Sequence, residues 1–185
     1  GAPVDKTKTV TVNVPAGACG SDTKMRVVMI ISSAINACDV TTQEEYEDYD
    51  ITIVPVVPMS YVSSAVTQNN TSDVYAGTYK QEVIGIKIVT TGQLDPLNVT
   101  QFNLSTTGTT LDADVNNAQL WTTGMSSVFA TTTQYGSDFA NPTSAGFNIA
   151  GSYSLDDGTN YFWLTYDIDV GAAGGNLIDA QCTQI

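Results

Sequence analysis

The feature of this sequence that most limits its fold is a succession of short, β-rich runs separated by turn residues. The runs recur at a spacing of roughly ten residues and are bounded by Gly, Asn, Asp or Pro, which is the pattern of a β-sandwich. No window keeps a helical stripe of apolar residues over three turns. We therefore predict an all-β chain, with strands in residues 8–15, 23–31, 48–55, 81–92, 97–108, 118–124, 126–136, 145–155, 159–168 and 176–184.

A proline-punctuated connector, "PVVPMSY" at residues 55–61, divides these strands into two groups. We predict two consecutive antiparallel β-sandwich domains of the immunoglobulin- or jelly-roll-like type, in residues 1–54 and 55–185. In the first domain the valines of "KTVTVNV" alternate with polar residues, as in a half-buried strand. Three clear strands leave one face of a sandwich uncovered, so the first domain is expected to be incomplete.

An incomplete sandwich exposes the unpaired N–H and C=O groups of an edge strand, which is the template for strand addition. The expected partners are therefore other copies of this chain or adjacent surface-protein domains. Head-to-tail repetition of such a contact produces a filament.

The charge balance excludes several classes of function. The chain has 19 acidic and 6 basic residues, a net charge of −13, which repels nucleic acid and anionic lipid surfaces. No apolar run approaches the length of a membrane span, so we expect no membrane insertion. There is no histidine, and Arg26 is the only arginine, so the common nucleophile–base pairs and arginine clamps are excluded. We expect a chain that is not an enzyme.

The low content of charged residues, 14%, indicates a neutral polar surface of the kind found on secreted β proteins. The expected location is extracellular or on the cell surface. The three cysteines, Cys19, Cys38 and Cys182, do not fit a framework in which all are paired. We expect one disulfide and one free thiol, with Cys19–Cys38 the favoured pair.

An acidic run, "QEEYEDYDITIVP" at residues 43–55, precedes the connector. Alternation in a strand places Glu45 and Glu47 on the same face as Tyr49 and Ile51. We expect Tyr49 and Ile51 to face a core, with the two glutamates at its rim.

Three interpretations of this run remain open at the level of sequence. Glu45 and Glu47 lie about 7 Å apart in a strand, so with Asp48 they are a candidate calcium site. The same carboxylates are close enough to pair with Arg26 and Lys24 of a neighbouring strand, and this structural interpretation is the favoured one. A catalytic carboxylate pair is the weakest, because no third polar partner is identifiable. We expect no cofactor other than this candidate calcium.

Two further groups of residues have a structural and a functional interpretation. In "YFWLTY", Tyr161 and Trp163 face one way, and these two rings are a candidate sugar-stacking platform. Packing within or between sheets is the favoured alternative. Asp156, Asp157 and Asn160 favour a hairpin turn over a calcium loop, because Asp and Asn bond to their own backbone in turns.

The first 54 residues resemble a known family. "TKMRVVM" at Thr23–Met29, followed by "EEYEDYDITI" at residues 44–53, is similar to the closing half of the GEVED domain, a module of secreted and surface proteins of Bacteroidetes. Its name comes from a Gly-Glu-Val-Glu-Asp-Tyr core, in which Glu44 and Tyr46 replace Gly and Val here. The acidic opening half of the module is absent from residues 1–54. The positions that match the core are Glu45, Glu47, Asp48 and Tyr49.

Residues 55–185 resemble the module that precedes the catalytic part of bacterial repeat-containing neuraminidases. The most specific pieces are "GTNYFWLTYDI" at Gly158–Ile168 and "GNLIDA" at Gly175–Ala180. Both resemblances imply export and a modular surface or accessory role, and neither implies catalysis. We expect a structural or adhesion protein, with a carbohydrate-binding accessory module of a secreted sialidase-type enzyme as the alternative.

Overall fold

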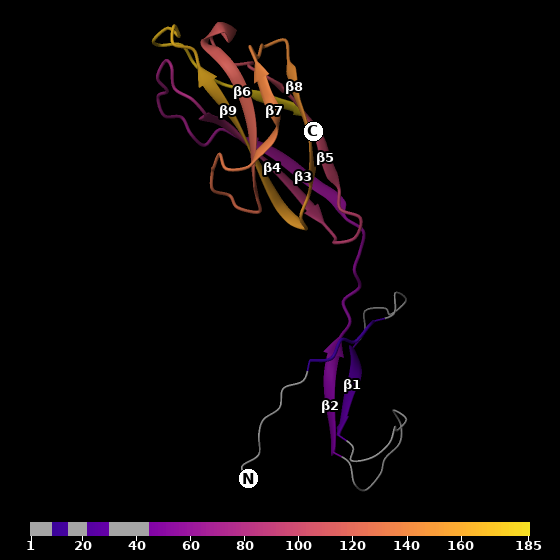
Figure 1. Ribbon diagram of the computed structural model, residues 1–185. Coiled ribbons are helices and arrows are strands. Elements are labelled where there is room, and N and C mark those ends of the chain that lie inside the picture. Colours follow the sequence, from indigo (N-terminus) through magenta and orange to yellow (C-terminus); the bar gives the residue numbers. More distant parts are fainter. Residues whose placement is uncertain (1–8, 15–21, 30–44) are drawn as a thin grey trace, which may run out of the picture. The chain divides into compact units, whose positions relative to one another are not determined.

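The computed structural model describes residues 9–14, 22–29 and 45–185 and divides the chain into two compact units, Gly1–Val56 and Val57–Ile185 (Figure 1). The described residues form an all-β structure of antiparallel sheets, as the sequence predicts. None of their helical residues forms a segment long and apolar enough to span a bilayer. The elements are β1 (Asp22–Met29), β2 (Glu45–Thr52), β3 (Ser60–Thr67), β4 (Gln81–Thr91), β5 (Asn98–Ser105), the 3-10 turn η1 (Asp112–Asp114), β6 (Val115–Gly124), β7 (Gln134–Ala140), β8 (Phe147–Ser154), β9 (Gly158–Ile168) and β10 (Gln181–Gln184).

In the first unit, β1 and β2 form a two-stranded antiparallel sheet. Its apolar side chains remain open to solvent, with Tyr49 46% and Ile51 36% exposed. The prediction that these two residues face a core was wrong for the described part of the unit. A two-stranded ladder pairs backbone groups, but it needs a second layer before its side chains are buried.

The predicted strand at residues 8–15 is also not formed, as far as the structure describes this segment. Residues 9–14 belong to no strand, and Val10, Val12 and Val14 are 69%, 68% and 55% exposed. The alternating pattern is suited to a half-buried strand. No partner strand lies beside it among the described residues.

The second unit is a β-sandwich. One sheet has five strands in the order β3-β4-β9-β6-β7, and the other has three in the order β10-β5-β8. Strand β9 lies at the centre of the larger sheet because its period-2 pattern is apolar on one face and aromatic or Thr-rich on the other. It pairs with β4 through Ile86 opposite Phe162, and with β6 through Leu120 opposite Leu164.

The hydrophobic core lies between the two sheets. Phe102 of β5 packs against Phe162 of β9 and Tyr135 of β7, with ring centroids 4.9 Å and 5.2 Å apart. Tyr135 donates its hydroxyl hydrogen to the carbonyl of Val99 at 3.2 Å. Tyr166 is fully buried in the same core, and its hydroxyl has no hydrogen-bond partner among the described residues.

The two sides of the sandwich differ. On one side β7 of the larger sheet contacts β8 of the smaller one. On the other side the larger sheet ends at β3, all eight of whose residues are exposed, whereas the neighbouring β4 is mostly buried. Because the smaller sheet has three strands and the larger sheet has five, the inner face of β3 has no strand opposite it among the described residues.

The predicted strands agree with β1, β2, β4, β5, β6, β8 and β9 to within a few residues. Three details differ. Residues 126–133 form a loop before β7, and only the last four residues of the predicted run at 176–184 form β10. Strand β3 begins within the predicted connector at residues 55–61 and was not predicted as a strand.

Candidate binding surfaces

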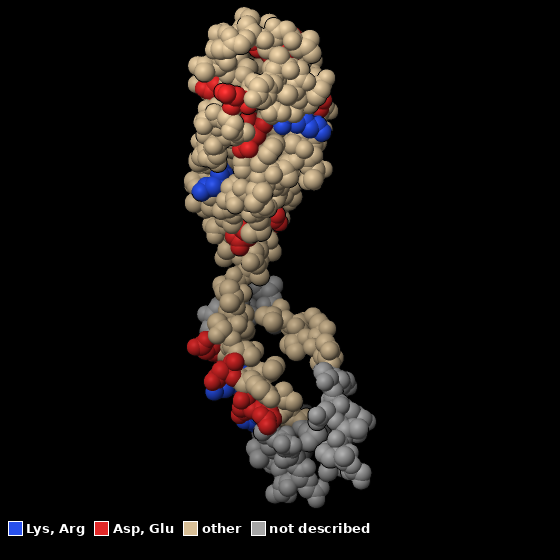
Figure 2. All heavy atoms as spheres, turned by 90° about the vertical axis from the view of Figure 1, so that its left-hand side faces the viewer, with Lys and Arg blue, Asp and Glu red and all other residues tan. Residues whose placement is uncertain are grey.

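The acidic run of the first unit lies on β2, and its register against β1 determines which carboxylate meets which cation. Arg26 lies opposite Asp48, and Lys24 lies opposite Asp50. The guanidinium of Arg26 donates from Nε to Oδ1 of Asp48 at 2.7 Å and from Nη2 to Oδ2 at 2.9 Å. Lys24 and Asp50 form a second ion pair. Figure 2 shows acidic and basic side chains side by side on this unit.

This register agrees with the expected ion pairing between the acidic run and Arg26, through Asp48. Glu47 lies opposite Val27, on the other face of the sheet from Arg26 and Asp48. The hydrogen bonds from Arg26 lower the pKa of the Asp48 carboxyl, and the positive charges of Arg26 and Lys24 act in the same direction.

The candidate calcium site of Glu45, Glu47 and Asp48 is not assembled by the described side chains. Both oxygens of Asp48 accept hydrogen bonds from Arg26, and the Glu45 side chain lies outside the described residues. The described residues contain no group of three Asp, Glu, His or Cys side chains placed to hold a metal ion. The calcium site therefore stays a hypothesis.

The candidate aromatic pair lies on the outer face of the larger sheet. The rings of Tyr161 and Trp163 are stacked at 12° with centroids 6.3 Å apart. Trp163 is only 4% exposed, because Phe129 of the β6–β7 loop packs against it and its Nε1 donates to Thr123 at 2.9 Å. Tyr161 is half-buried, whereas Trp163 is too buried to offer its ring face to a sugar.

A glycine in β4 makes room for this tryptophan. Gly85 lies opposite Trp163 across the β4–β9 ladder. A Cβ at Gly85 would come within 2.9 Å of Cζ3 of the indole ring, closer than side chains tolerate. The ring thus lies across the neighbouring strand, which is the use of a strand glycine for close approach.

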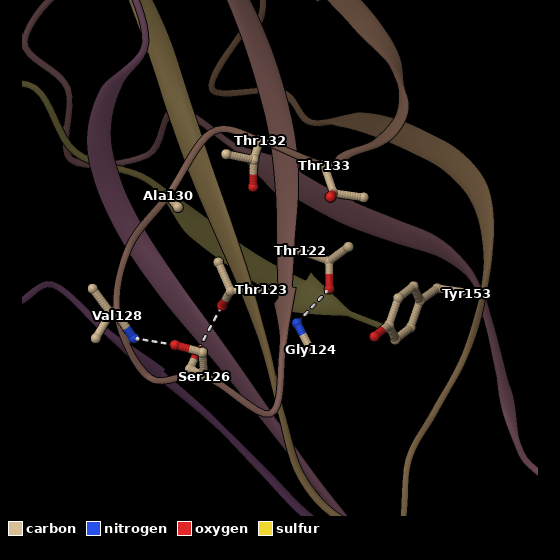
Figure 3. Close-up of a pocket in the computed structure, with 9 residues that line it drawn as sticks. All are labelled: Thr122, Thr123, Gly124, Ser126, Val128, Ala130, Thr132, Thr133 and Tyr153. Atoms are coloured by element: carbon tan, nitrogen blue, oxygen red, sulfur yellow. Dashed lines mark hydrogen bonds between the residues drawn. The ribbon is translucent and has the colours of Figure 1, made fainter.

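A shallow pocket of about 410 Å³ lies beside these rings, at the end of β6 and the following loop (Figure 3). Its wall is rich in hydroxyls and has no charged group. Thr123 donates to the carbonyl of Ser126 at 2.6 Å, and the Ser126 hydroxyl accepts from the amide of Val128 at 3.3 Å. The lining residues are Thr122, Thr123, Gly124, Ser126, Val128, Ala130, Thr132, Thr133 and Tyr153.

A larger groove of about 600 Å³ follows the uncovered side of the sandwich. It runs between the inner face of β3 and the outer edge of β10. Its floor is apolar, with Val66 and Ile88 from the larger sheet, and Cys182 and Ile185 line the opposite wall. Cys182 is a free thiol, and burial raises its pKa. Cys19 and Cys38 lie outside the described residues, so the expected disulfide stays a prediction.

The acidic and amide residues at 156–160 form a turn. Asn160 donates from Nδ2 to the carbonyl of Asp156 at 2.9 Å and accepts from the amide of Asp156 at the same distance. Asp157 accepts from the amide of Gly92 at 3.1 Å. These side chains therefore stabilise the turn and the neighbouring loop through hydrogen bonds to the backbone.

Comparison with known protein families finds a match in the first part of the chain. Residues 1–52 match the GEVED domain. This match covers the β1–β2 sheet and its acidic run, and it agrees with the resemblance seen in the sequence. No curated protein matches the chain.

Sequence reasoning did not find the groove or the hydroxyl-lined pocket. The groove depends on β3, whose "SYVSSAVT" lacks a regular apolar alternation because small Ser and Ala residues interrupt it. The pocket depends on how the loop at 125–133 folds back over β6. The cluster of Thr and Ser in this loop was the one available signal, and it is not specific.

Proposed function

We propose that this chain is a non-catalytic structural or adhesion protein of the cell surface, which joins other copies of itself by β-strand addition. One observation carries the proposal. Strand β3 is an eight-residue edge strand that is exposed along its whole length and contains no charged residue and no proline. Soluble proteins normally protect such an edge with charge, proline or a covering segment, because it is a template for pairing.

The apolar content of this edge strengthens the argument. Tyr61 and Val66, which line the groove on this side of the sandwich, are 58% and 43% exposed. An added strand on this side gains the backbone hydrogen bonds of a sheet edge and covers these two side chains.

An extracellular location is supported by composition and by the GEVED match. The surface shown in Figure 2 carries few charged side chains over the second unit, in keeping with 14% charged residues in the whole chain. The GEVED domain is a module of secreted and surface proteins of Bacteroidetes, and we extend that role to this chain. Adjacent surface-protein domains are further partners of the same edge.

Sedimentation velocity of the purified chain over a concentration series from about 1 to 100 µM tests self-association, since weak strand addition is populated in this range. We expect larger species to grow with concentration. Added salt should leave the association unchanged or strengthen it, because the contact is uncharged and the chain carries a net charge of −13. A monomer at every concentration and salt level would overturn self-assembly.

The alternative is a carbohydrate-binding accessory module of a secreted sialidase-type enzyme. Two observations favour it: the uncharged, hydroxyl-lined pocket that includes Tyr153, and the partial exposure of Tyr161. The likeness of residues 55–185 to the neuraminidase-associated module rests on sequence motifs alone. A glycan array of the full chain tests it, with Thr132→Val as the pocket variant and Thr107→Val, outside the pocket, as the control. Glycan binding that only Thr132→Val abolishes would support this alternative.

The absence of catalysis is a separate part of the proposal. It is supported by the lack of histidine and the single arginine, since a sialidase site clamps the substrate carboxylate with several arginines. Incubation of the purified chain with a sialoside should release no sialic acid. Turnover abolished by Glu45→Gln or Glu47→Gln would contradict this expectation.

A further inference from the structure

The groove on the uncovered side of the second unit has the form of a missing strand position. The larger sheet extends to β3, but the facing sheet stops at β10, which pairs with β5 on one edge only. Along β4 alternate residues are buried by the facing sheet, whereas the inner residues of β3, including Tyr61, Ser64 and Val66, line the groove instead. One more strand beside β10 would cover this face.

The chemistry of the groove selects its occupant. None of its lining side chains is charged, although the chain as a whole has a net charge of −13. An ionic ligand would therefore find no charged side chain in it. An extended chain segment finds the unpaired backbone edge of β10 on one wall and the apolar floor of Val66 and Ile88 below.

A segment with matching properties is present in the same chain. Residues 9–14, "TVTVNV", alternate valine with Thr or Asn, so one face is apolar and the other is polar. The structure leaves this segment outside every sheet with its three valines more than half exposed. It contains no charged residue. Residues 9–14 thus have a strand pattern but belong to no described sheet, and the groove beside β10 offers a strand position that no described strand fills.

The charges that flank the two parts favour a contact between copies. Lys6 and Lys8 directly precede the segment, whereas residues 57–185 contain two lysines, no arginine and many carboxylates. The basic flank is attracted to the acidic second unit, which offsets part of the repulsion between two chains of the same net charge.

We propose that residues 9–14 of one copy insert as a strand into the groove of a second copy, beside β10, with Val10, Val12 and Val14 facing the floor. This inference rests on the proposed self-association by strand addition, and it places the added strand at the edge of β10, over the inner face of β3, and not at the backbone edge of β3 itself. The contact is heterologous, since it joins different surfaces of the two copies, and its repetition extends the assembly along one direction.

The thiol of Cys182 in the wall of the groove permits a direct test. Two versions of the full chain are mixed, both with Cys19→Ser and Cys38→Ser, and the self-association of this background is measured first. The donor version carries Cys182→Ser and one cysteine at a position from 9 to 14. The acceptor version keeps Cys182 and carries an affinity tag. Oxidised glutathione is the oxidant. The reaction is run at mildly alkaline pH because burial raises the pKa of the Cys182 thiol.

The expected result is a parity pattern that does not depend on the register of the added strand. Neighbouring side chains on one face of a ladder lie within disulfide range, whereas those on the other face point away. Donors with Val10→Cys, Val12→Cys or Val14→Cys should form the mixed disulfide dimer at least about tenfold faster than donors with Thr9→Cys, Thr11→Cys or Asn13→Cys.

The outcomes separate this inference from the function on which it rests. Self-association without the parity pattern overturns the donor–groove contact and leaves strand addition standing. A background that stays monomeric overturns both. A monomeric product from a single chain that carries both Val12→Cys and Cys182 would show that the segment fills its own groove, and this would overturn the contact between copies.

A matched pair of substitutions on β3 tests the groove from the acceptor side. Val66 and Val62 are similarly exposed, at 43% and 54%, but only Val66 lines the groove. Val66→Asp should weaken self-association at least about tenfold, because the contact would bury an unpaired charge. Val62→Asp should change it by less than about threefold. Equal effects of the two substitutions would overturn the assignment of the groove.

Discussion

The two units of this chain use similar strands but hold them by different means. In the second unit β9 is paired on both edges and buried on its inner face by the opposite sheet. In the first unit the described strands β1 and β2 pair only with each other, and their contacts across the ladder include exposed ion pairs. Exposed ion pairs contribute little to stability, whereas buried side chains contribute most of it.

The difference shows that alternation in a sequence describes a strand's potential and not its environment. Strand β2 carries Tyr49 and Ile51 on one face near its end, as β8 carries Phe147 and Ile149, but among the described residues only β8 has a second layer against it. The number of layers, and not the pattern of a strand, decides whether the apolar face is buried. The following predictions test this comparison, beginning with the largest effect.

Truncation of an aromatic residue should destabilise the second unit when the residue lies in its core, and should leave it unchanged when the residue lies in the first unit. Phe162→Ala removes a fully buried ring and should destabilise the second unit by about 3–5 kcal/mol. Tyr49→Ala, at a residue 46% exposed, should leave the unfolding of the second unit unchanged. Both tryptophans, Trp121 and Trp163, lie in the second unit, so denaturation followed by tryptophan fluorescence reports that unit alone. Equal losses from the two variants would contradict the comparison.

The outer aromatic layer should be sensitive at its glycine. Gly85→Ala forces Trp163 to shift and should cost about 1–3 kcal/mol in the same denaturation experiment. Gly174→Ala is the control, because a Cβ there meets no atom within 4 Å, and it should change stability by less than about 0.5 kcal/mol. A neutral Gly85→Ala would show that the ring is free to move.

The unpartnered hydroxyl in the core should reduce stability. Tyr166→Phe removes it and should stabilise the second unit by about 1 kcal/mol, whereas Tyr135→Phe removes a hydroxyl that bonds to Val99 and should destabilise it by a similar amount. Denaturant midpoints of the two variants at neutral pH measure both effects. Stabilisation by Tyr135→Phe and loss by Tyr166→Phe would reverse the assignment.

The same residue predicts an alkaline limit of stability. Burial, with the charges of Asp179 and Asp112, raises the pKa of the Tyr166 phenol. Because the folded-state pKa lies above the unfolded value of about 10, the stability linked to this group is complete below about pH 10 and is lost as the pH rises above it. Tyr166→Phe should make the unfolding free energy less dependent on pH between about 10 and 11.5. An unchanged slope would show that another group controls it.

The ion pair of the first unit should have the smallest effect. Asp48 has a lowered pKa because Arg26 bonds to it, so any stability from the pair is present above the ordinary pKa of aspartate and is lost as the pH falls through the lowered value. Arg26→Ala should raise the pKa of Asp48 toward its ordinary value in an NMR titration. Lys24→Ala should raise it less. Millimolar calcium should leave the titration unchanged, since both oxygens of Asp48 are engaged by Arg26.

The sequence predicts the fold class and most of the strands because their signals are local. Alternation and turn residues suffice for β4, β5 and β9. Strand β3 was not predicted because its apolar residues do not alternate regularly. It is exposed on both faces, so its sequence has no distinct apolar face. Residues 9–14 show the reverse case, a clear strand pattern without a sheet among the described residues.

The candidate sites were less predictable because they depend on pairing between distant segments. The register of β1 against β2 places Arg26 opposite Asp48 and places Glu47 on the other face of the sheet, and a single sequence does not specify that register. Tyr161 and Trp163 were correctly predicted to share a face. The burial of Trp163 could not be predicted, because it depends on Phe129 in a loop whose path does not follow from the sequence pattern.

The position of β4 between two other strands, β3 and β9, has a consequence for proteolysis. Residues 57–185 offer a protease that cleaves after basic residues only two sites, Lys80 and Lys87. The backbone at Lys87 is held on both sides, opposite Ala65 of β3 and Tyr161 of β9, and the amine of Lys80 lies 4.6 Å from the centre of the Trp121 ring. Cleavage requires an extended, accessible backbone, so trypsin can cut at these sites only after the sheet has unfolded locally. The second unit should therefore outlast a trypsin digestion that cuts β1 at Lys24 or Arg26, since the two-stranded sheet of β1 and β2 has no second layer among the described residues.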